Sequence, residues 1–253
     1  MTHASLFSGI GGFDLAARNC GIQNIFQVEI NEFCRKVLEK NFPETKKYRD
    51  IKEFDGTEYY GTIDIISGGF PCQPFSVAGK QRGAADERYL WGEMLRVIRE
   101  CLPRWVVAEN VRGLLAANDE IEFEKVCASL EDEGYTILPN ILPATIADAP
   151  HRRERIFIVG RYFESIDTDT ESNRIGEFCD TIQTQRDEGR TLILREPFGL
   201  HWAEAISRIH GVYNGLSRGL DRRRNAALGN AIVPQVAEIL FKAMIETDKI
   251  LCD

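Results

Sequence analysis

A thiol stands in an unusual setting at Cys72, within the segment GGFPCQPFS (68–76). Pro71 and Pro74 flank it closely, and each proline ring fixes a backbone φ angle, so the chain is stiff here. The apolar run IDIIS (63–67) before it is typical of a strand. A structural cysteine needs no such rigidity, whereas a cysteine nucleophile must be presented in a fixed position. Cys72 is therefore a candidate nucleophile, with a buried structural thiol as the alternative.

A carboxyl group and two guanidinium groups stand at the ends of other predicted strands. Glu109 closes the run WVVAE (105–109), where burial would raise its pKa and make it a proton donor. Arg153 and Arg155 are two positions apart at the start of the run RIFIVG (155–160), so both face the same side of that strand. The alternatives are a surface carboxylate and a solvated basic edge.

Three glycines follow the first apolar run, in the segment SLFSGIGGFDLA (5–16). Gly9, Gly11 and Gly12 lie between a predicted strand and a predicted helix, where the backbone can approach a ligand closely and a helix N-terminus favours polar or anionic groups. Nucleotides, flavins and S-adenosylmethionine all bind turns of this kind. The alternative is a tight turn without a ligand.

Two acids come near the ends of the next strands. Glu29 closes the run NIFQVE (24–29), and an acid at that place can bind ribose hydroxyl groups. Asp50 precedes Ile51 near the following strand end, where its carboxylate could accept a hydrogen bond from an adenine amine. Together with the glycine turn, these acids indicate a cofactor that contains a nucleoside.

The elements that must position these residues alternate between strand and helix patterns, which predicts an α/β domain with a mainly parallel sheet. The segment 164–191 is polar and weakly periodic, so a loop-rich insertion is expected there. Apolar residues recur at helical spacing after Pro234, which predicts a last helix. Strands are expected at 3–7, 24–29, 63–67, 105–109, 134–142 and 155–160, and helices at 13–20, 31–41, 88–101 and 119–133.

Composition sets outer limits on the function. The 253 residues suffice for one large domain or a domain with a small appendage, and no apolar run approaches the ~18 residues of a membrane span. The seven cysteines are an odd number without a CxxC pair, so neither a zinc site nor a disulfide framework is expected. The net charge of −8 alone counts against a nucleic-acid partner, although arginines cluster at 152–155 and 222–224.

The glycine turn and the PCQ segment together resemble the C5-cytosine DNA methyltransferases, and further segments match that family in its order. The resemblance covers residues 4–160 and 226–245, and it is closest to compact members from phages and prophages. It implies a Rossmann-like S-adenosylmethionine-dependent methyltransferase sheet flanked by helices, with a small loop-rich insertion. The further segments are AENV (108–111), HRRERIFIVG (151–160) and GNAIVPQV (229–236). The implied catalytic domain is 1–163 with 226–253, and the implied reduced target-recognition region is 164–225.

The resemblance implies methyl transfer from S-adenosylmethionine to C5 of a flipped cytosine in DNA, through a covalent bond between Cys72 and C6. Glu109 would donate to N3 of the base, and Arg153 and Arg155 would bind the base O2, the phosphate and the Cys72 loop. No metal is needed. The loop 77–89 would close over the DNA.

The same resemblance assigns further side chains to the cofactor and to the substrate. The substrate residues implied are Ser76, Asn110 and His151, of which His151 stands where the family usually has Gln. The cofactor residues implied are Phe7, Gly9, Gly11, Gly12, Glu29, Ile30, Asp50, Ile51, Gly69, Pro71, Asn230 and Ala231.

Other functions stay open. One branch of the family methylates transfer RNA at cytosine C5, and a DNA-binding relative without catalysis is a further alternative. An NAD-dependent oxidoreductase would explain the glycine turn and Glu29 but not the other motifs. The partners expected are double-stranded DNA, a cognate restriction endonuclease system and no membrane. A monomer in the cytoplasm of a bacterial or phage-infected cell is expected, since no secretory signal is evident.

Overall fold

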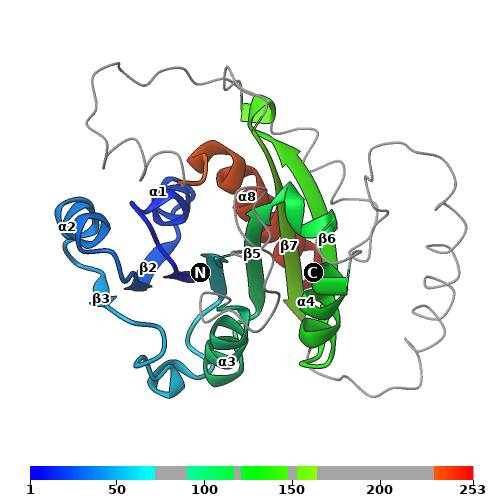
Figure 1. The fold of residues 1–253 in the computed structure, drawn as a ribbon, viewed down its shortest axis with the longest axis horizontal. Helices are drawn as coiled ribbons and strands as arrows, with labels where there is room; N and C mark the ends of the chain where they lie inside the picture. Colours follow the sequence, from blue (N-terminus) through cyan, green and yellow to red (C-terminus); the bar gives the residue numbers. More distant parts are fainter. Residues whose placement is uncertain (72–89, 117–120, 148–152, 164–230, 253) are drawn as a thin grey trace, which may run out of the picture.

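The structure of the protein, a computed structural model, describes residues 1–71, 90–116, 121–147, 153–163 and 231–252. These residues form a seven-stranded sheet in the order β3-β2-β1-β4-β5-β7-β6 (Figure 1). The strands are β1 (Thr2–Leu6), β2 (Gln23–Val28), β3 (Lys46–Tyr48), β4 (Ile65–Gly69), β5 (Trp105–Val111), β6 (Tyr135–Pro143) and β7 (Glu154–Tyr162).

The sheet is parallel from β3 to β5 and antiparallel beyond it. Strand β1 pairs in parallel with β2 and β4, and β2–β3 and β4–β5 are parallel as well. Strand β7 runs antiparallel to both β5 and β6. The predicted mainly parallel sheet is confirmed. The edge strand β3 was not among the predicted elements, because its three residues KKY carry no apolar alternation.

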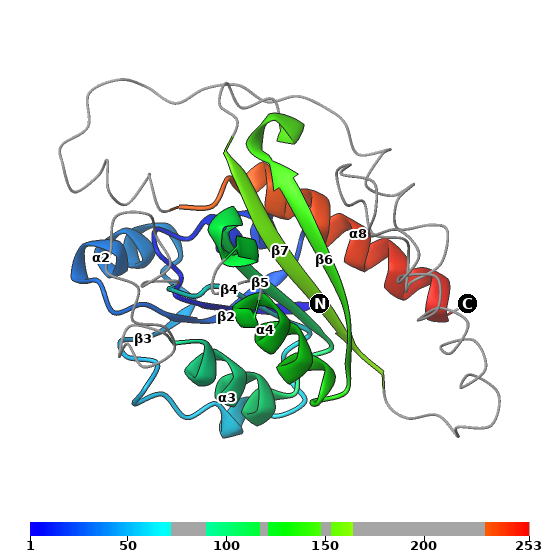
Figure 2. The ribbon, with the colours of Figure 1, turned by 45° about the vertical axis from the view of Figure 1, so that its right-hand side comes forward.

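Helices cover both faces of the sheet (Figure 2). Helices α3 (Trp91–Cys101) and α4 (Ile121–Glu131) contribute to the apolar core on one face, together with Phe26, Ile66 and Val106. Helices α1 (Gly12–Asn19) and α8 (Pro234–Cys252) contribute to the core on the other face, with Trp105 and Phe157. Helix α2 (Glu32–Asn41) follows β2 and is capped by the Asn31 side chain, which accepts from Cys34 N at 3.2 Å.

The end of the chain returns to its beginning. Phe241 of α8 packs against Phe13 of α1, with ring centroids 6.2 Å apart. Gly12 lies so close to Ile232 that a Cβ atom added to it would be 2.4 Å from Ile232 Cγ2. The last helix predicted after Pro234 is confirmed, and the residues just before it lie against the glycine turn.

None of the helices in the described part of the chain is long and apolar enough to cross a membrane. The division into a catalytic domain and a target-recognition region at 164–225 stays a prediction, because that region lies outside the described residues.

Candidate active site

Three strand ends meet where the predicted catalytic side chains lie. Gly69 of β4 is paired with Glu109 of β5, and Glu109 is paired with Phe157 of β7. The carboxyl ends of β4 and β5 therefore lie beside the start of the antiparallel strand β7. Ligands of open α/β sheets bind at such carboxyl ends.

The Glu109 carboxyl group is largely buried and is paired with a cation. Its Oε1 lies 2.9 Å from Arg155 Nε, and the two side chains are 12% and 23% exposed. Burial raises the pKa of Glu109, while the charges of Arg155 and Arg153 lower it, and burial is the larger effect. The prediction that burial raises this pKa is confirmed.

Because Gly69 has no side chain, it leaves room for the Glu109 carboxyl group. A Cβ atom added at Gly69 would lie 2.9 Å from Glu109 Oε2. The neighbouring Gly68 is equally constrained, because its added Cβ would lie 2.9 Å from the backbone oxygen of Leu6. The resemblance assigns Gly69 to the cofactor, which stays a prediction; the structure shows that its missing side chain leaves room for the Glu109 carboxyl group. Glu109 thus presents Oε1 to Arg155 and Oε2 to the end of β4.

Arg153 and Arg155 border a small cavity that opens to solvent. Its apolar lining includes Phe157 and the residues Ile232 and Val233 just before α8. Burial and the neighbouring charge of Arg155 lower the pKa of Arg153, which Glu109 partly offsets. The prediction that Arg153 and Arg155 share a side is consistent with this common lining. Two cations beside a partly open apolar cavity can receive an anionic or carbonyl-bearing ligand.

Asn110 is buried and joins the same strand ends. Its Nδ2 donates to the Phe70 carbonyl oxygen at 3.0 Å, and its Oδ1 accepts from Val111 N at 2.8 Å. Phe70 is in turn packed against Trp91, with ring centroids 5.0 Å apart. Asn110 therefore fastens the backbone that leads into Pro71. The predicted residues Cys72, Ser76 and His151 lie outside the described residues.

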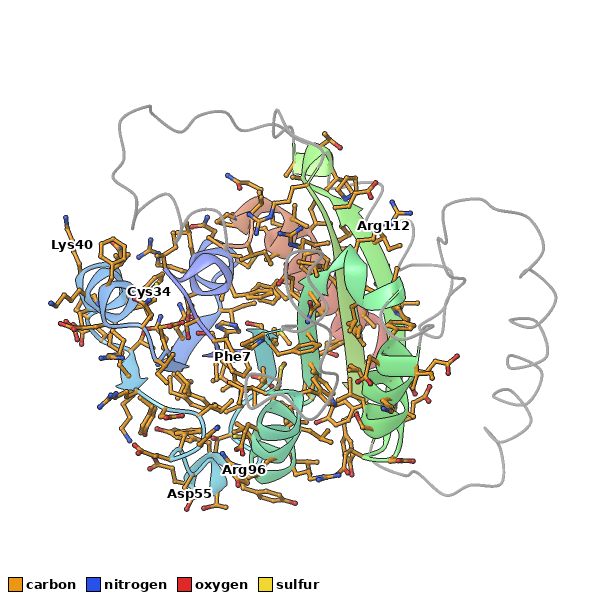
Figure 3. The ribbon with its side chains drawn as sticks, viewed as in Figure 1. Phe7, Cys34, Lys40, Asp55, Arg96 and Arg112 are labelled. Atoms are coloured by element: carbon orange, nitrogen blue, oxygen red, sulfur yellow. The ribbon has the colours of Figure 1, made fainter. Side chains whose placement is uncertain are left out.

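A second ion pair, which was not predicted from the sequence, connects the end of β5 to the start of β7. Arg112, labelled in Figure 3, pairs with Glu154 of β7 through its Nη1 atom. Glu154 alternates with Arg153 and Arg155, so it points to the opposite side of the strand from them. That alternation of charge in RRER was the signal that could have revealed it. The start of β7 is thus tied by ion pairs to Glu109 and to Arg112.

The glycine turn after β1 contains a run of left-handed backbone angles. The φ angles are 53° at Phe7, 56° at Gly9 and 88° at Gly11. For a phenylalanine this conformation costs about 1–3 kcal/mol, so the surrounding contacts must hold it. Phe7, labelled in Figure 3, follows the end of β1.

The glycines of the turn have different neighbours. A Cβ atom at Gly9 would meet nothing within 4 Å, so the backbone there faces open space. At Gly11 it would lie 2.6 Å from Phe42 Cε2, and at Gly12 it would collide with Ile232. Gly9 is thus the member of the turn whose backbone is open to a ligand. Gly11 and Gly12 instead allow Phe42 and Ile232 to pack closely against the turn.

Glu29 lies beside this open backbone. Its Oε2 accepts from Gly9 N and its Oε1 accepts from Asn31 N, both at 2.7 Å. Each carboxylate oxygen has a second lone pair, so Glu29 can still accept from ribose hydroxyl groups. Ile30 is 63% exposed next to it, and an exposed apolar side chain can pack against a flat ring.

The predicted adenine contacts lie on the segment after β3, and this segment is clamped from α3. Arg96 donates to the Ile51 carbonyl oxygen at 2.5 Å and to the Phe54 carbonyl oxygen at 2.9 Å. Ile51 itself is 4% exposed and belongs to the core, so only its backbone is placed to meet a ligand. The Asp50 carboxylate accepts from Lys52 N at 3.0 Å. Figure 3 shows Arg96 next to this segment; no motif in the sequence pointed to it.

The last two predicted cofactor positions lie just before α8. Ala231 is partly buried in the segment that contacts Gly12, and Asn230 lies outside the described residues. The structure therefore brings Glu109, Arg153 and Arg155 together, and it groups the glycine turn with Glu29 and Ile30.

Solved structures share this fold. A protein described as a DNA modification methyltransferase encoded within a prophage (E. coli) has a TM-score of 0.55 at 29% identity, covering 64% of this chain and 47% of that one. A DNMT2 mutant from Spodoptera frugiperda has a TM-score of 0.62 at 17% identity, covering 96% and 99% of the two chains, which shows likeness of fold. The fold is thus that of the Rossmann-like S-adenosylmethionine-dependent methyltransferases.

Sequence comparison assigns the chain to one family within this fold. The model of the C-5 cytosine-specific DNA methylase family matches residues 1–193, and this chain belongs to that family. The Type II methyltransferase M.Eco47II of Escherichia coli is 39% identical over 161 residues, which is 62% of this chain and 39% of that protein. M.HhaI of Haemophilus parahaemolyticus is 34% identical over 155 residues, 61% of this chain and 47% of that protein. This chain therefore aligns with less than half the length of these relatives.

Proposed function

We propose that the protein methylates C5 of cytosine in DNA, with S-adenosylmethionine as the methyl donor. The observation that carries this proposal is the buried Glu109 carboxyl group, paired with Arg155 at the strand end where Asn110 fastens the segment leading to Cys72. A buried acid beside a guanidinium group, at the strand end that precedes Cys72 in the sequence, suits a reaction that places negative charge on a nitrogen heterocycle. Family membership and the Type II relatives support the reaction class.

The proposed first step activates a base carbon that is a poor nucleophile. The Cys72 thiolate adds to C6 of cytosine, a C6–sulfur bond forms, and the electrons of the C5–C6 double bond move toward N3. Glu109 meets this charge with a proton or hydrogen bond, which requires the raised pKa that burial gives it. C5 then accepts the methyl group, and loss of the C5 proton with elimination of the thiolate restores the double bond.

The residues around the glycine turn suit S-adenosylmethionine, which supplies an electrophilic methyl group when bound. Gly9 offers an open backbone, and Glu29 retains lone pairs for the ribose hydroxyl groups. Ile30 would cover one side of the adenine, with Asp50 and the Ile51 backbone at its polar edge. Pro71 would lie beside the sulfonium end, because it follows β4 near Glu109. Phe7, Gly11, Gly12 and Gly69 shape this pocket, and Asn230 and Ala231 close it.

The target cytosine must leave the DNA stack to reach Glu109, at a cost of a few kcal/mol that protein contacts offset. We assign O2 of the base and the adjoining phosphate to Arg153 and Arg155. Asn110 acts by fastening the Phe70 backbone, and Ser76 and His151 are proposed contacts of the extruded nucleotide. Residues 164–225 are the proposed target-recognition region, within a catalytic domain formed by 1–163 and 226–253. Double-stranded DNA and a restriction endonuclease system are the proposed partners.

Transfer of tritium from methyl-labelled S-adenosylmethionine tests the proposal. Random-sequence DNA should become labelled, and bisulfite sequencing should place the label at C5 of cytosine. Cys72→Ser should abolish labelling, while Cys34→Ser, which changes a buried cysteine on α2, serves as the matched control. Labelling of transfer RNA instead of DNA would overturn the substrate and favour the RNA branch of the family. Absence of label on both would overturn the enzymatic proposal.

A further inference from the structure

A buried acid lies behind the glycine turn and has no part in the chemistry proposed above. Asp14 stands in the first turn of α1, and its side chain is fully buried. Ser5 Oγ lies 2.9 Å from Asp14 Oδ1 and 3.0 Å from Oδ2. A buried carboxyl group requires hydrogen-bond partners, so the serine is a contact that the acid depends on.

The contact continues from Ser5 to the turn itself. Ser5 Oγ lies 2.7 Å from Ser8 Oγ, and Ser8 Oγ can donate to the carbonyl oxygens of Ser5 at 3.0 Å and Val28 at 3.3 Å. Ser8 N also donates to Val28 O at 3.1 Å, and Ser8 O accepts from Gly11 N at 2.9 Å. Ser8 thus fastens the turn by its backbone and its side chain. Its two chain neighbours, Phe7 and Gly9, are both left-handed.

The direction of this hydrogen-bond chain depends on one proton, because each serine hydroxyl group has a single hydrogen to donate. With a proton on Asp14, the acid donates to Ser5, Ser5 donates to Ser8, and Ser8 donates to a backbone carbonyl group. Without that proton, Ser5 must donate to the carboxylate and Ser8 must donate to Ser5. The carbonyl groups then lose the Ser8 proton. In both protonation states the chain Asp14–Ser5–Ser8 stays connected, and Val28 O also accepts from Ser8 N.

The charged and titratable neighbours do not neutralise a carboxylate at this place by direct contact. His3 is fully buried, and its ring nitrogens lie 2.7 Å from Asn24 Oδ1 and 2.8 Å from Ser67 Oγ. Burial lowers the pKa of His3, which keeps the ring neutral. Lys47 Nζ donates to two backbone carbonyl oxygens at 2.6 Å. Burial raises the pKa of Asp14, while the charge of His3 and hydrogen bonds with Gln27 and Ser5 lower it.

We propose that Asp14 is a positioning residue for the cofactor and that it acts through Ser5 and Ser8 to hold the turn 7–11 in its receptive shape. The identity of the ligand rests on the proposed function. Asp14 itself does not contact the ligand, since it lies behind the turn and is fully buried. Its removal should loosen the turn and weaken cofactor binding while the sheet stays folded.

Calorimetric titration of the full chain with S-adenosylmethionine tests this role. Asp14→Ala and Ser5→Ala should each raise the dissociation constant by about tenfold, since each leaves one buried polar group without its partner. Asp14→Asn should stay near the wild-type value, because its amide group can donate to Ser5 as the protonated acid does. Asp248→Asn is the matched control: it changes another buried acid, Asp248 of α8, which pairs with Arg104 just before β5. It should lower the thermal midpoint and leave the dissociation constant unchanged.

Hydrogen exchange of the ligand-free chain gives a readout that does not depend on the ligand. The amides of Ser8, Gly9 and Gly11 should exchange faster in Asp14→Ala and Ser5→Ala than in the wild type, while β4 and β5 stay protected. Wild-type exchange and wild-type affinity in a folded Asp14→Ala variant would overturn the inference alone. An Asp14→Asn variant that behaves as poorly as Asp14→Ala would overturn the role of the hydrogen bond to Ser5. A wild-type chain that binds no S-adenosylmethionine, with exchange altered as expected, would overturn the proposed function instead.

Discussion

Glu109 combines opposing influences on one carboxyl group. Burial favours its neutral form, and the adjacent guanidinium group of Arg155, 2.9 Å away, favours the charged form. Burial is the larger influence, so the pKa of this carboxyl group is raised. The small residue opposite it, Gly69, allows this placement.

Replacing Glu109 by Gln tests its role as a proton donor while keeping its place in the structure. The amide keeps the size of the side chain and can still contact Arg155, but it cannot supply a proton. Methyl transfer should fall by about 10²–10⁴-fold, the usual contribution of general acid catalysis. S-adenosylmethionine affinity, measured by calorimetry, should stay unchanged. Activity within threefold of the wild type (about 0.7 kcal/mol) would contradict the assigned role.

The buried acid Asp14 should make stability depend on pH with a definite sign. Its folded pKa is raised above the ordinary 3.8 by burial, which outweighs the lowering by His3. In the window between the two pKa values the folded chain binds a proton that the unfolded chain has released, so unfolding becomes easier as pH rises. Asp14→Asn lacks this titration, while His3 and Lys47 remain in both proteins.

Urea unfolding of both proteins from about pH 4 to pH 8 measures this effect. The free energy of unfolding of the wild type, minus that of Asp14→Asn, should fall as pH rises, by about 1.4 kcal/mol for each unit by which the pKa is raised. A difference that stays constant or increases with pH would show that Asp14 is charged in the folded state.

At the scale of elements, helix α3 positions the segment after β3. Arg96 spans the distance with one planar group: it donates to the backbone of Ile51 and Phe54 and pairs with Glu93 and Glu100 at 2.9 and 2.6 Å. Glu100 also accepts from Gly56 N at 2.8 Å. The segment that carries Asp50 is therefore fixed by hydrogen bonds from helix α3, which packs in the same apolar core.

Arg96→Lys should loosen that segment, because a lysine cannot replace the planar fork of five donors. S-adenosylmethionine affinity should fall by about tenfold, which corresponds to about 1.4 kcal/mol. Arg99→Lys is the control on the same helix, since Arg99 is half-exposed and pairs with Glu133. Equal affinities of the two variants would show that the clamp has no influence on the cofactor.

Sequence patterns predicted the long elements and missed the contacts between them. Short apolar runs located β1, β2, β4, β5, β6 and β7, because the strands of a sheet covered on both faces carry nearly continuous apolar residues. The three-residue strand β3 was missed because it is an edge strand held by backbone pairing with β2. The local motif gave Glu109 and Arg155, but the roles of Gly69 and Arg96 depend on neighbours distant in the chain. No pattern in one sequence reports such neighbours.

At the scale of the whole molecule, the first and last helices of the chain pack against each other. Helix α8 packs on α1 beside the glycine turn, and its far end is held to the sheet by Asp248. Asp248 is largely buried and accepts from Arg104 at 2.8 Å, from Trp105 Nε1 at 3.2 Å and from Arg161 at 3.4 Å. This cluster joins α8 to β5 and β7.

Asp248→Asn should destabilise the whole fold without affecting the site. The substitution removes the charge that organises three donors, and hydrogen bonds to a charged group contribute about 2 kcal/mol each. The free energy of unfolding in urea should therefore fall by at least about 2 kcal/mol. Unchanged stability would mean that the cluster does not hold α8 in place.

The central claim is that Cys72 attacks a cytosine that Glu109 and Arg155 receive. An oligonucleotide that contains 5-fluorocytosine measures this most directly, because fluorine at C5 blocks the final elimination. Mass spectrometry after incubation with S-adenosylmethionine should find a covalent protein–DNA adduct at Cys72, and Cys72→Ser should form none. An adduct at another residue, or active methylation of cytosine by the Cys72→Ser variant, would contradict the account.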